Sequence, residues 1–269
     1  WDLLDIVRAC YALRPEGIQW VYDAEGKPSF RLELLTKANG ISHENAHDAL
    51  ADVYATIAIA KLIRDKQPKL FQYLFNLRNK HQVKALIDVI SMKPLVHVSG
   101  MFSAWQGCVS WVSPVAWHPT NQNAVIVVDL TQSVQPLIDL SAADIRARLY
   151  TKRSELGDDL PIGIKLIHIN KCPVLAPAAT LTEQRADELG INRLQCRESL
   201  NLLRQHPEIR EKLIEVFAPS PEHEDPVQQE AELQLYAGFF QDGDKATMEL
   251  VRSTPPEQLA ERTFVFNDA

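Results

Sequence analysis

The sequence has little glycine and cysteine and no long hydrophobic run. Ten of the 269 residues are glycine, and the four cysteines stand far apart without a Cys-x-x-Cys pair: Cys10, Cys108, Cys172 and Cys196. Such spacing gives no signal of a disulfide framework or of a thiolate zinc site, so we expect a reducing, cytoplasmic location. No stretch reaches the roughly 18 uncharged apolar residues that a membrane-spanning helix needs, so we expect no membrane segment.

The chain also lacks the usual features of a protein's beginning. Its first residue is Trp1 rather than Met, and residues 2–7 already have the pattern of a helix without a preceding signal peptide. We therefore expect the chain to begin inside a longer protein. Its 46% hydrophobic content and net charge of −7 indicate a globular protein of one large or two ordinary domains.

Charge is unevenly distributed along the sequence. Residues 61–110 hold eight basic and two acidic side chains, a local balance of +6, whereas residues 207–269 hold five basic and fourteen acidic ones, a balance of −9. An acidic protein with a basic middle can still bind a polyanion, because the field near a site depends on local charge. The alternative is an ordinary solvated helix face.

Apolar periodicity predicts an order of elements. Helices are expected over residues 2–13, 30–38, 44–66 and 141–150, from Pro68 onward and again from Thr182 onward. In residues 44–66, one apolar face is expected to carry Ala46, Leu50, Val53, Ile57, Ala60 and Ile63. Short antiparallel strands are expected at 95–98, 108–112, 124–130 and 161–169, and residues 219–226 are the best linker.

Two short motifs overlap at the start of the 44–66 helix. His43-Glu44-x-x-His47 has the spelling of a zinc peptidase site, in which two histidines bind zinc and the glutamate acts as a base. That site also needs a third ligand, and no glutamate occurs between Glu44 and Glu155. So short a pattern often arises by chance, which makes zinc the less favoured alternative.

The second motif is His47-x4-Asp52. Five helical residues place the two side chains roughly 140° apart and about 7.5 Å along the axis, so they do not readily hold one ion together. They can instead flank a scissile phosphate, with the aspartate holding a divalent metal and the histidine taking a proton from the attacking water. A capping histidine and an exposed aspartate are the plain structural alternative.

Longer segments around these motifs resemble a known family. Residues 30–41 (FRLELLTKANGI) followed by 45–52 (NAHDALAD) resemble the third exonuclease motif of the His-containing DEDD 3′→5′ exonucleases, and more narrowly the bacterial exonuclease I family. Residues 8–17 (RACYALRPEG), 92–102 (MKPLVHVSGMF) and 167–176 (IHINKCPVLA) support the match. The resemblance covers essentially the whole chain.

The resemblance implies a fold and an activity. The expected fold is α/β: residues 1–67 form the C-terminal part of a ribonuclease-H-like exonuclease domain, 68–220 an SH3-like β-barrel domain, and 221–269 the start of a helical C-terminal domain. The implied activity is Mg²⁺-dependent 3′→5′ degradation of single-stranded DNA to 5′-mononucleotides by a monomer, in DNA repair and recombination. His47 would be the general base and Asp52 a metal carboxylate.

One departure from the family concerns its other metal carboxylates, which lie upstream of this motif. Asp23-Ala24-Glu25 has the spelling of the family's Asp-x-Glu, but it precedes Gly26 in a polar segment and is interpreted as a solvated turn. Two-metal hydrolysis needs several carboxylates, and Asp52 alone cannot supply them. We therefore expect this chain by itself to be inactive.

Candidate residues for single-stranded DNA are cations, one amide and one aromatic ring. Guanidinium forks pair with phosphate oxygens, and an aromatic face stacks with a base. The candidates, at positions that resemble the family's DNA groove, are Arg31, Arg8, Tyr73, Lys80, Asn123 and Lys165. Ordinary alternatives are surface charge for Arg8 and Lys80, core packing for Tyr73 and an edge-strand charge for Lys165. Trp105, Trp111 and Trp117 are interpreted as barrel core.

A protein partner is also implied by the resemblance. The family docks the acidic, Phe-ended C-terminal tail of single-stranded DNA-binding protein, which needs a basic rim beside an apolar pocket. Arg14, Tyr73, Lys93 and Arg204 are the candidates for that rim. A second hypothesis follows, in which the chain is a non-catalytic module that binds single-stranded DNA and this tail.

Overall fold

The computed structural model describes residues 1–42, 49–157, 159–219 and 240–267. Its contacts divide the chain into two compact units, residues 1–218 and residues 219–269. The predicted domain boundaries near residues 67 and 220 stay predictions, and the predicted linker falls mostly on residues outside the described ranges.

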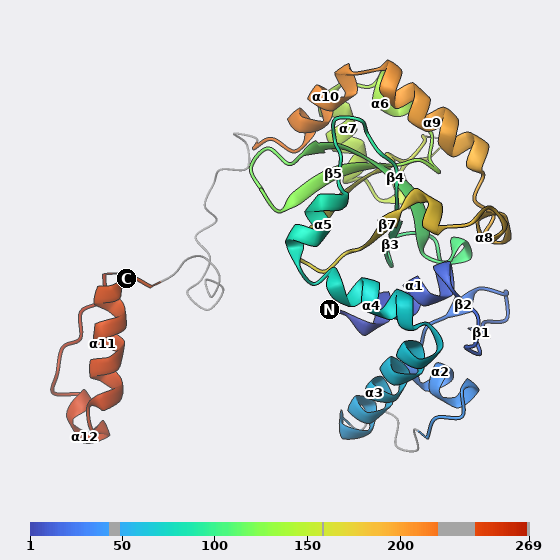
Figure 1. Ribbon diagram of the computed structural model, residues 1–269. Coiled ribbons are helices and arrows are strands. Elements are labelled where there is room, and N and C mark those ends of the chain that lie inside the picture. Colours follow the sequence, from blue (N-terminus) through green and yellow to red (C-terminus); the bar gives the residue numbers. More distant parts are fainter. Residues whose placement is uncertain (43–48, 158, 220–239, 268–269) are drawn as a thin grey trace. The chain divides into compact units, whose positions relative to one another are not determined.

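The first part of unit 1 is mainly helical (Figure 1). It contains α1 (Leu3–Leu13), the hairpin of β1 (Val21–Tyr22) and β2 (Pro28–Ser29), α2 (Leu32–Ala38), α3 (Ala49–Lys66) and α4 (Pro68–Asn76). The side chain of Asp2 accepts a hydrogen bond from the Leu4 amide and so caps α1. Pro68 occupies the first turn of α4, where a missing N–H costs nothing. These helices agree with the sequence prediction.

Helix α1 is the structural centre of unit 1. From Ile6 to Leu13 every residue except Arg8 is buried, and the helix packs against strands of the sheet as well as against α3 and α4. A helix that is apolar around most of its circumference must be enclosed by other elements. Its position therefore fixes the first helices of unit 1 against the sheet.

The predicted apolar face of α3 is only partly right. Leu50, Val53 and Ile57 are wrong, because they are 60%, 52% and 44% exposed. The helix buries Ala55, Ile59 and Ile63, and of these Ile63 was on the predicted face. Apolar side chains surround this helix, so periodicity alone does not select the face that packs.

A five-stranded antiparallel sheet forms the middle of unit 1. Its strands are β3 (Leu95–Val98), β4 (Val109–Trp117), β5 (Ala124–Asp129), β6 (Ile164–His168) and β7 (Val174–Pro177), in the order β6-β5-β4-β3-β7. The register shifts between Pro114 and Ala116, where proline has no N–H for the ladder. All four predicted strands are present, as β3, β4, β5 and β6. Strand β7 is additional and was not predicted from the sequence.

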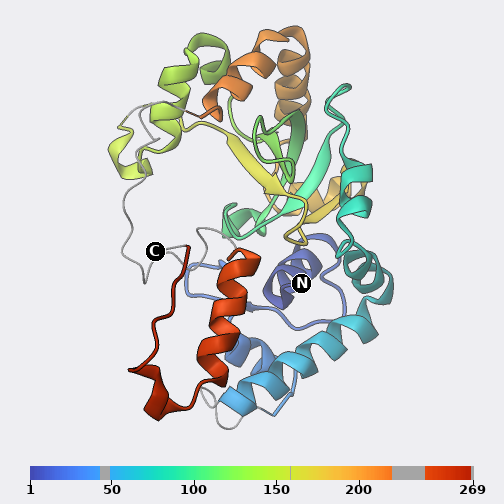
Figure 2. The same ribbon diagram turned by 90° about the vertical axis from the view of Figure 1, so that its left-hand side faces the viewer.

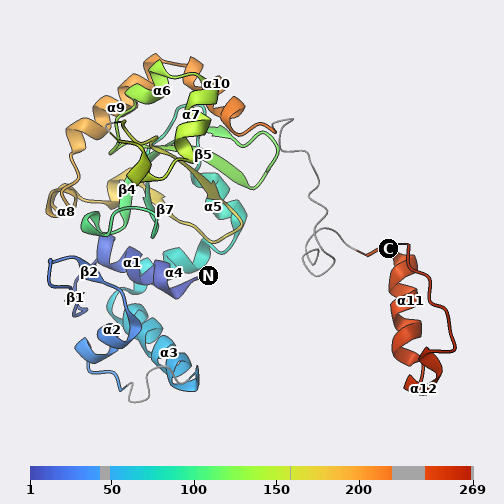
Figure 3. The ribbon, with the colours of Figure 1, turned by 180° about the vertical axis from the view of Figure 1, so that it is seen from behind.

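Helices cover the sheet and complete its core (Figures 1 and 3). They are α5 (Lys80–Leu86), α6 (Gln135–Asp139), α7 (Ala142–Leu149), α8 (Glu183–Glu188), α9 (Arg193–Gln205) and α10 (Glu208–Val216), with short 3-10 turns at 104–106, 153–155 and 178–180. Ser141, Thr182 and Asn192 cap the N-termini of α7, α8 and α9 through their side chains. In Figure 2, α7 and α10 lie together at the end of unit 1 that is remote from α2 and α3.

Unit 2 is a small helical segment. It contains α11 (Asp242–Ser253) and α12 (Pro256–Leu259), and the buried Asp244 accepts a 2.7 Å hydrogen bond from the Asn267 amide. This contact ties the segment after α12 back to the first turn of α11. Among the helices of the described ranges, none has the length and apolar character needed to cross a membrane.

Candidate nucleic-acid interface

A groove of about 910 Å³ lies between α1, α2 and α3. Arg8 of α1 and Arg31, which directly precedes α2, both line it, and Thr56 and Ile59 of α3 form another wall. Arg31 is 69% exposed and forms an ion pair with Glu33. The structure thus brings together two of the cations that the sequence predicted for phosphate contacts.

Asp52 lies in the first turn of α3 and is partly buried. It precedes Thr56 by four residues, so both side chains lie on the same face of the helix, the one that borders the groove. His47, the predicted general base, lies outside the described residues, as do His43 and Glu44 of the zinc motif. Neither the nuclease nor the zinc interpretation of these histidines is therefore tested by the structure.

Possible metal ligands are spread apart in the part of the chain that the structure describes. Within the described ranges no three His, Cys, Asp or Glu side chains come together as a possible metal cluster. Asp23 and Glu25 do not help: Asp23 Oδ1 accepts hydrogen bonds from the Glu25 and Lys27 amides, 3.0 and 2.9 Å long, in the turn of the β1–β2 hairpin. The interpretation of this segment as a turn is confirmed.

Arg8 lies at the boundary between α1 and the sheet. Its Nη1 donates to Asp5 Oδ1 at 2.8 Å, and its side chain is 22% exposed. Its Nε is buried and has no hydrogen-bond partner among the described residues. The guanidinium lies flat against Gly100, where an added Cβ would be 2.8 Å from Cζ and 2.9 Å from each terminal nitrogen.

Lys165 of β6 lies near the same boundary. Its Nζ donates a 2.5 Å hydrogen bond to Ser99 Oγ, although β5 and β4 separate its strand from β3 in the sheet. The sheet therefore curls toward a barrel. The ammonium also lies 4.8 Å from the centroid of the Phe102 ring. Burial lowers the pKa of Lys165 to about 8, although Asp5 and Asp129 oppose this shift.

Beneath Phe102 lies a buried histidine. His97 of β3 packs edge-on against Phe102, with ring centroids 5.5 Å apart. Its Nδ1 donates a 2.8 Å hydrogen bond to the Val174 carbonyl, since a carbonyl can only accept. Burial, reinforced by the charge of Lys165, lowers the pKa of His97 to about 3 and keeps the ring neutral.

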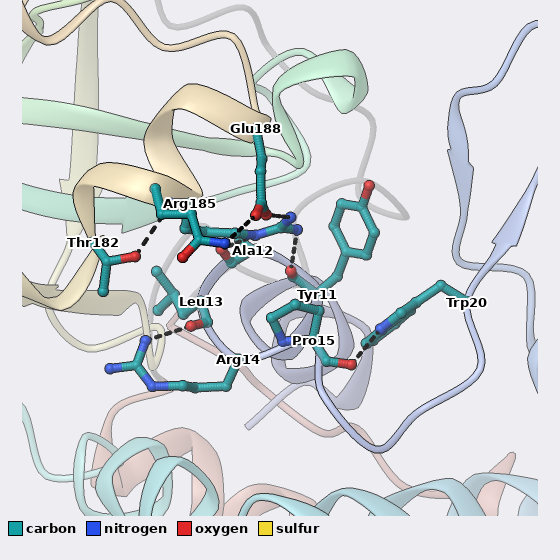
Figure 4. Close-up of polar contacts among 10 residues, drawn as sticks. Tyr11, Ala12, Leu13, Arg14, Pro15, Trp20, Thr182, Arg185 and Glu188 are labelled. Atoms are coloured by element: carbon teal, nitrogen blue, oxygen red, sulfur yellow. Dashed lines mark hydrogen bonds and ion pairs between the residues drawn. The ribbon is translucent and has the colours of Figure 1, made fainter.

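Arg185 joins α1 to the sheet domain (Figure 4). From α8, its Nη2 donates to the Tyr11 carbonyl at 2.7 Å and its Nε to the Ala12 carbonyl at 3.1 Å, while Nη1 pairs with Glu188 at 2.8 Å. The last carbonyls of a helix lack partners inside the helix, and a cation there also complements the helix dipole. Arg185 could not be identified from the sequence, because no sequence pattern pairs it with α1.

The remaining DNA candidates lie away from the Arg8–Arg31 groove. Lys80 is exposed at the start of α5, and Asn123 directly precedes β5, where its carbonyl accepts a hydrogen bond from Ile169. Tyr73 of α4 is half-buried and its hydroxyl donates a 2.9 Å hydrogen bond to the Leu175 carbonyl. Burial raises the pKa of Tyr73. Their roles in DNA binding stay predictions.

A second groove of about 530 Å³ has an apolar floor and charged walls. Its apolar lining includes Pro94, Trp111, Leu130, Leu181 and Leu200. Its charged residues are Arg193, Arg197 and Glu183, and Arg193 pairs with Glu183. Neither arginine was identified from the sequence, because only the fold brings α9 beside the segment after β7.

The predicted partner residues do not line this second groove, but several contact segments next to its lining. Lys93 is exposed and adjoins Pro94. Arg204 Nη2 donates a 2.9 Å hydrogen bond to the Ser91 carbonyl, and Arg14 Nη1 donates one of 3.1 Å to the Thr180 carbonyl. The Tyr73 hydroxyl donates to the Leu175 carbonyl of β7. The segment that contains Thr180 directly follows this strand.

The interpretation of the three tryptophans as barrel core is only partly right. Trp111 and Trp117 lie on β4 and pack against the core, and Trp111 Nε1 donates to the Ala178 carbonyl at 3.1 Å. The prediction is wrong for Trp105, which is 54% exposed on the 3-10 turn 104–106. That turn belongs to a loop between β3 and β4, where alternation of apolar residues gives no information about burial.

The fold is that of a nuclease's SH3-like domain, preceded by a mainly helical part. Residues 78–219 match the family model described as Exonuclease I SH3-like domain, and residues 229–269 match the one described as Exonuclease I C-terminal domain. The chain belongs to the exonuclease I family. The resemblance and the α/β fold expected from the sequence are thereby confirmed.

Relatives of the chain are considerably longer. Exodeoxyribonuclease I of Escherichia coli strain K12 is 58% identical over 268 residues, which cover 100% of this chain and 56% of the relative. A crystal structure of E. coli Exonuclease I in complex with a dA16 oligonucleotide matches with a TM-score of 0.91 and 57% identity, over 99% of this chain and 56% of that one. A crystal structure of SSB/Exonuclease I in complex with inhibitor CFAM matches with a TM-score of 0.85 and 55% identity, over 99% and 55%.

Proposed function

We propose that this chain is the part of a 3′→5′ exodeoxyribonuclease that holds single-stranded DNA and supplies His47 and Asp52 to its active site. The observation that carries the proposal is the placement of Arg8 and Arg31 in one groove, whose α3 wall includes Thr56, one helical turn after Asp52. Guanidinium groups can bind a phosphodiester, and a carboxylate one turn away can hold the metal that assists its cleavage. The oligonucleotide complex of the E. coli relative supports the same substrate class.

The proposed reaction releases 5′-mononucleotides and depends on Mg²⁺, in DNA repair and recombination. Arg8, Arg31 and Lys165 hold backbone phosphates, Lys80 and Asn123 add contacts farther along the strand, and Tyr73 offers a face for one base. His47 accepts the proton of the attacking water. A bound Mg²⁺ would supply charge neutralisation at the phosphate, and Asp52 is the described residue suited to hold it.

A protein-docking role is the second proposed function. The groove of about 530 Å³ combines an apolar floor with the cations of Arg193 and Arg197. Lys93 is next to Pro94 in the sequence, and Arg14 and Arg204 contact segments adjacent to the lining. An acidic peptide with an apolar end is complementary to such a surface. We propose that the C-terminal tail of single-stranded DNA-binding protein docks here, in keeping with the SSB-containing crystal structure of the relative.

A chimera tests the proposed activity. In it, this chain replaces the matching segment of the Escherichia coli exodeoxyribonuclease I. The chimera should degrade single-stranded DNA from its 3′ end in Mg²⁺, and the isolated chain should only bind it. An inactive but folded chimera would contradict the assignment of His47 and Asp52, and would favour the non-catalytic binding module instead. A monomeric state and a cytoplasmic location belong to the same proposal.

A further inference from the structure

The turn that follows β3, residues 99–102, contacts both of the cations at the boundary between α1 and the sheet. Ser99 accepts a hydrogen bond from Lys165 Nζ, and the Phe102 ring faces the same ammonium. Gly100 lies against the guanidinium of Arg8. One short turn thus contacts a cation of α1 and a cation of β6, two elements that are far apart in the sequence.

The turn itself is firmly held. Phe102 N donates to the Ser99 carbonyl at 3.0 Å, and Ser99 N donates to the Cys108 carbonyl at 2.8 Å, which closes the loop between β3 and β4. Phe102 packs on His97, whose ring is fixed by its bond to Val174. A rigid turn can impose positions on flexible side chains, because their rotamer freedom is already lost before a ligand binds.

We propose that Gly100 and Ser99 are positioning residues that set the locations of Arg8 and Lys165 for two neighbouring phosphates of single-stranded DNA. The inference rests on the proposed function and adds to it two residues without charge. Gly100 acts through its missing side chain, since a Cβ would fall 2.8 Å from Arg8 Cζ. Ser99 acts through its hydroxyl oxygen, which accepts the hydrogen bond from Lys165 Nζ.

The substitution Gly100→Ala isolates the effect on Arg8. The atoms that the new methyl group would meet are the far end of a flexible side chain, so the arginine moves and the backbone stays. The backbone of Gly100 is also outside the left-handed region, whereas six other glycines have positive φ. We therefore expect a folded protein whose Arg8 guanidinium is displaced from Gly100.

The first measurement is binding of a labelled single-stranded oligonucleotide by the full chain at several salt concentrations. Gly100→Ala should weaken binding about tenfold, and should reduce the log–log salt slope by about 0.7, the value for one lost phosphate contact. Gly190→Ala is the matched control: the same methyl group enters open space at φ +67°, so it costs stability without approaching Arg8.

A double-mutant cycle gives the decisive comparison. Gly100→Ala should have almost no further effect on affinity in an Arg8→Ala background, because no guanidinium remains to be displaced. Gly100→Ala should keep its full effect in a Lys165→Ala background. Ser99→Ala should have almost no further effect in the Lys165→Ala background and its full effect in the Arg8→Ala background. Additive effects of Gly100→Ala and Arg8→Ala, or unchanged binding by Gly100→Ala, would overturn the inference while leaving the proposed function intact.

A second measurement needs no DNA. The Arg8 Nε–H is buried in the folded chain, so its NMR signal should exchange slowly with water. Gly100→Ala should accelerate this exchange, and Gly190→Ala should not. Unchanged exchange would overturn the inference. If the wild-type chain binds no oligonucleotide while the exchange responds as expected, the proposed function fails and the proposed role in binding fails with it.

Discussion

Arg185 donates a 2.7 Å hydrogen bond to the carbonyl of Tyr11, and this contact links α8 to the end of α1 (Figure 4). The guanidinium is also 5.1 Å from the Tyr11 ring centroid, and its side chain is 15% exposed. The helix that carries Arg8 is thereby fixed to the domain that carries Lys165. The geometry of the DNA groove depends on this junction.

Arg185→Ala should therefore lower the free energy of unfolding by about 2 kcal/mol, since buried carbonyls lose charged donors. Denaturant unfolding of the full chain measures this change. Arg64→Ala is the control, because Arg64 pairs with Asp65 at the surface, with side chains 57% and 63% exposed. Its effect should stay below about 0.5 kcal/mol. Equal effects of both substitutions would refute the structural role of Arg185.

DNA binding should weaken as pH rises through about 8. Lys165 has its pKa lowered to about 8 by burial, so it loses the charge that a phosphate contact needs. Anisotropy titrations between pH 7 and pH 9 measure the decline. Lys165→Arg is the matched variant, because arginine stays charged throughout, and its binding should be nearly constant over this range. Parallel profiles for the two proteins would show that Lys165 does not contact DNA.

The folded chain should lose stability in acid through His97. Its pKa is about 3 in the folded protein and near 6.5 when unfolded, so below pH 6.5 the unfolded chain binds a proton that the folded one does not. The free energy of unfolding is therefore unaffected by this titration above pH 6.5. It falls as the pH decreases from 6.5 to 3, by as much as about 4 kcal/mol. Urea unfolding at several pH values tests this.

His97→Gln should flatten that acid decline, because glutamine does not titrate. The exposed His81 of α5 provides the control, and His81→Gln should retain the wild-type pH dependence. A steep decline that persists in His97→Gln would assign acid sensitivity to other groups.

In the chimera, His47→Ala should reduce turnover by about 100-fold or more and leave DNA affinity nearly unchanged, as expected for a lost general base. Asp52→Asn should reduce activity and raise the Mg²⁺ concentration required. Initial rates on 5′-labelled single-stranded DNA measure both effects. Normal turnover by His47→Ala would remove this residue from the mechanism.

Zinc content separates the nuclease from the peptidase interpretation of the same motif. Purified chain should contain no stoichiometric zinc by elemental analysis. One tightly bound zinc per chain that disappears in His43→Ala would instead support a metallopeptidase-like site.

Much of the fold could be predicted because its signals are local. The helix over residues 2–13, Pro68 at a helix start and the β-rich segment 95–98 each depend on a few adjacent residues. The buried face of α3 was predicted correctly at Ile63 but not at Leu50, Val53 and Ile57, because periodicity is the same whether these side chains are buried or exposed. Strand β7 was missed because Val174–Pro177 is short and contains no alternation of apolar and polar residues.

Residues of the candidate site could be predicted only where a charged side chain itself would contact the phosphate. Arg8, Arg31 and Lys165 were identified from the chemistry of phosphate binding and from resemblance to the family. Gly100 and Arg185 were not, because each acts through a contact with a residue far away in the sequence. Such pairings exist only after the chain has folded.

The most direct test of the account measures one polypeptide, the 269-residue chain itself, with a labelled single-stranded oligonucleotide in Mg²⁺. Affinity should fall with added salt, with a log–log slope of about −2 for phosphate contacts by Arg8, Arg31 and Lys165, and cleavage should stay at background. Absence of binding at low salt, or binding that salt does not change, would contradict the proposed DNA groove. Robust cleavage by this chain alone would show that local carboxylates complete a metal site and that the catalytic centre has been misplaced.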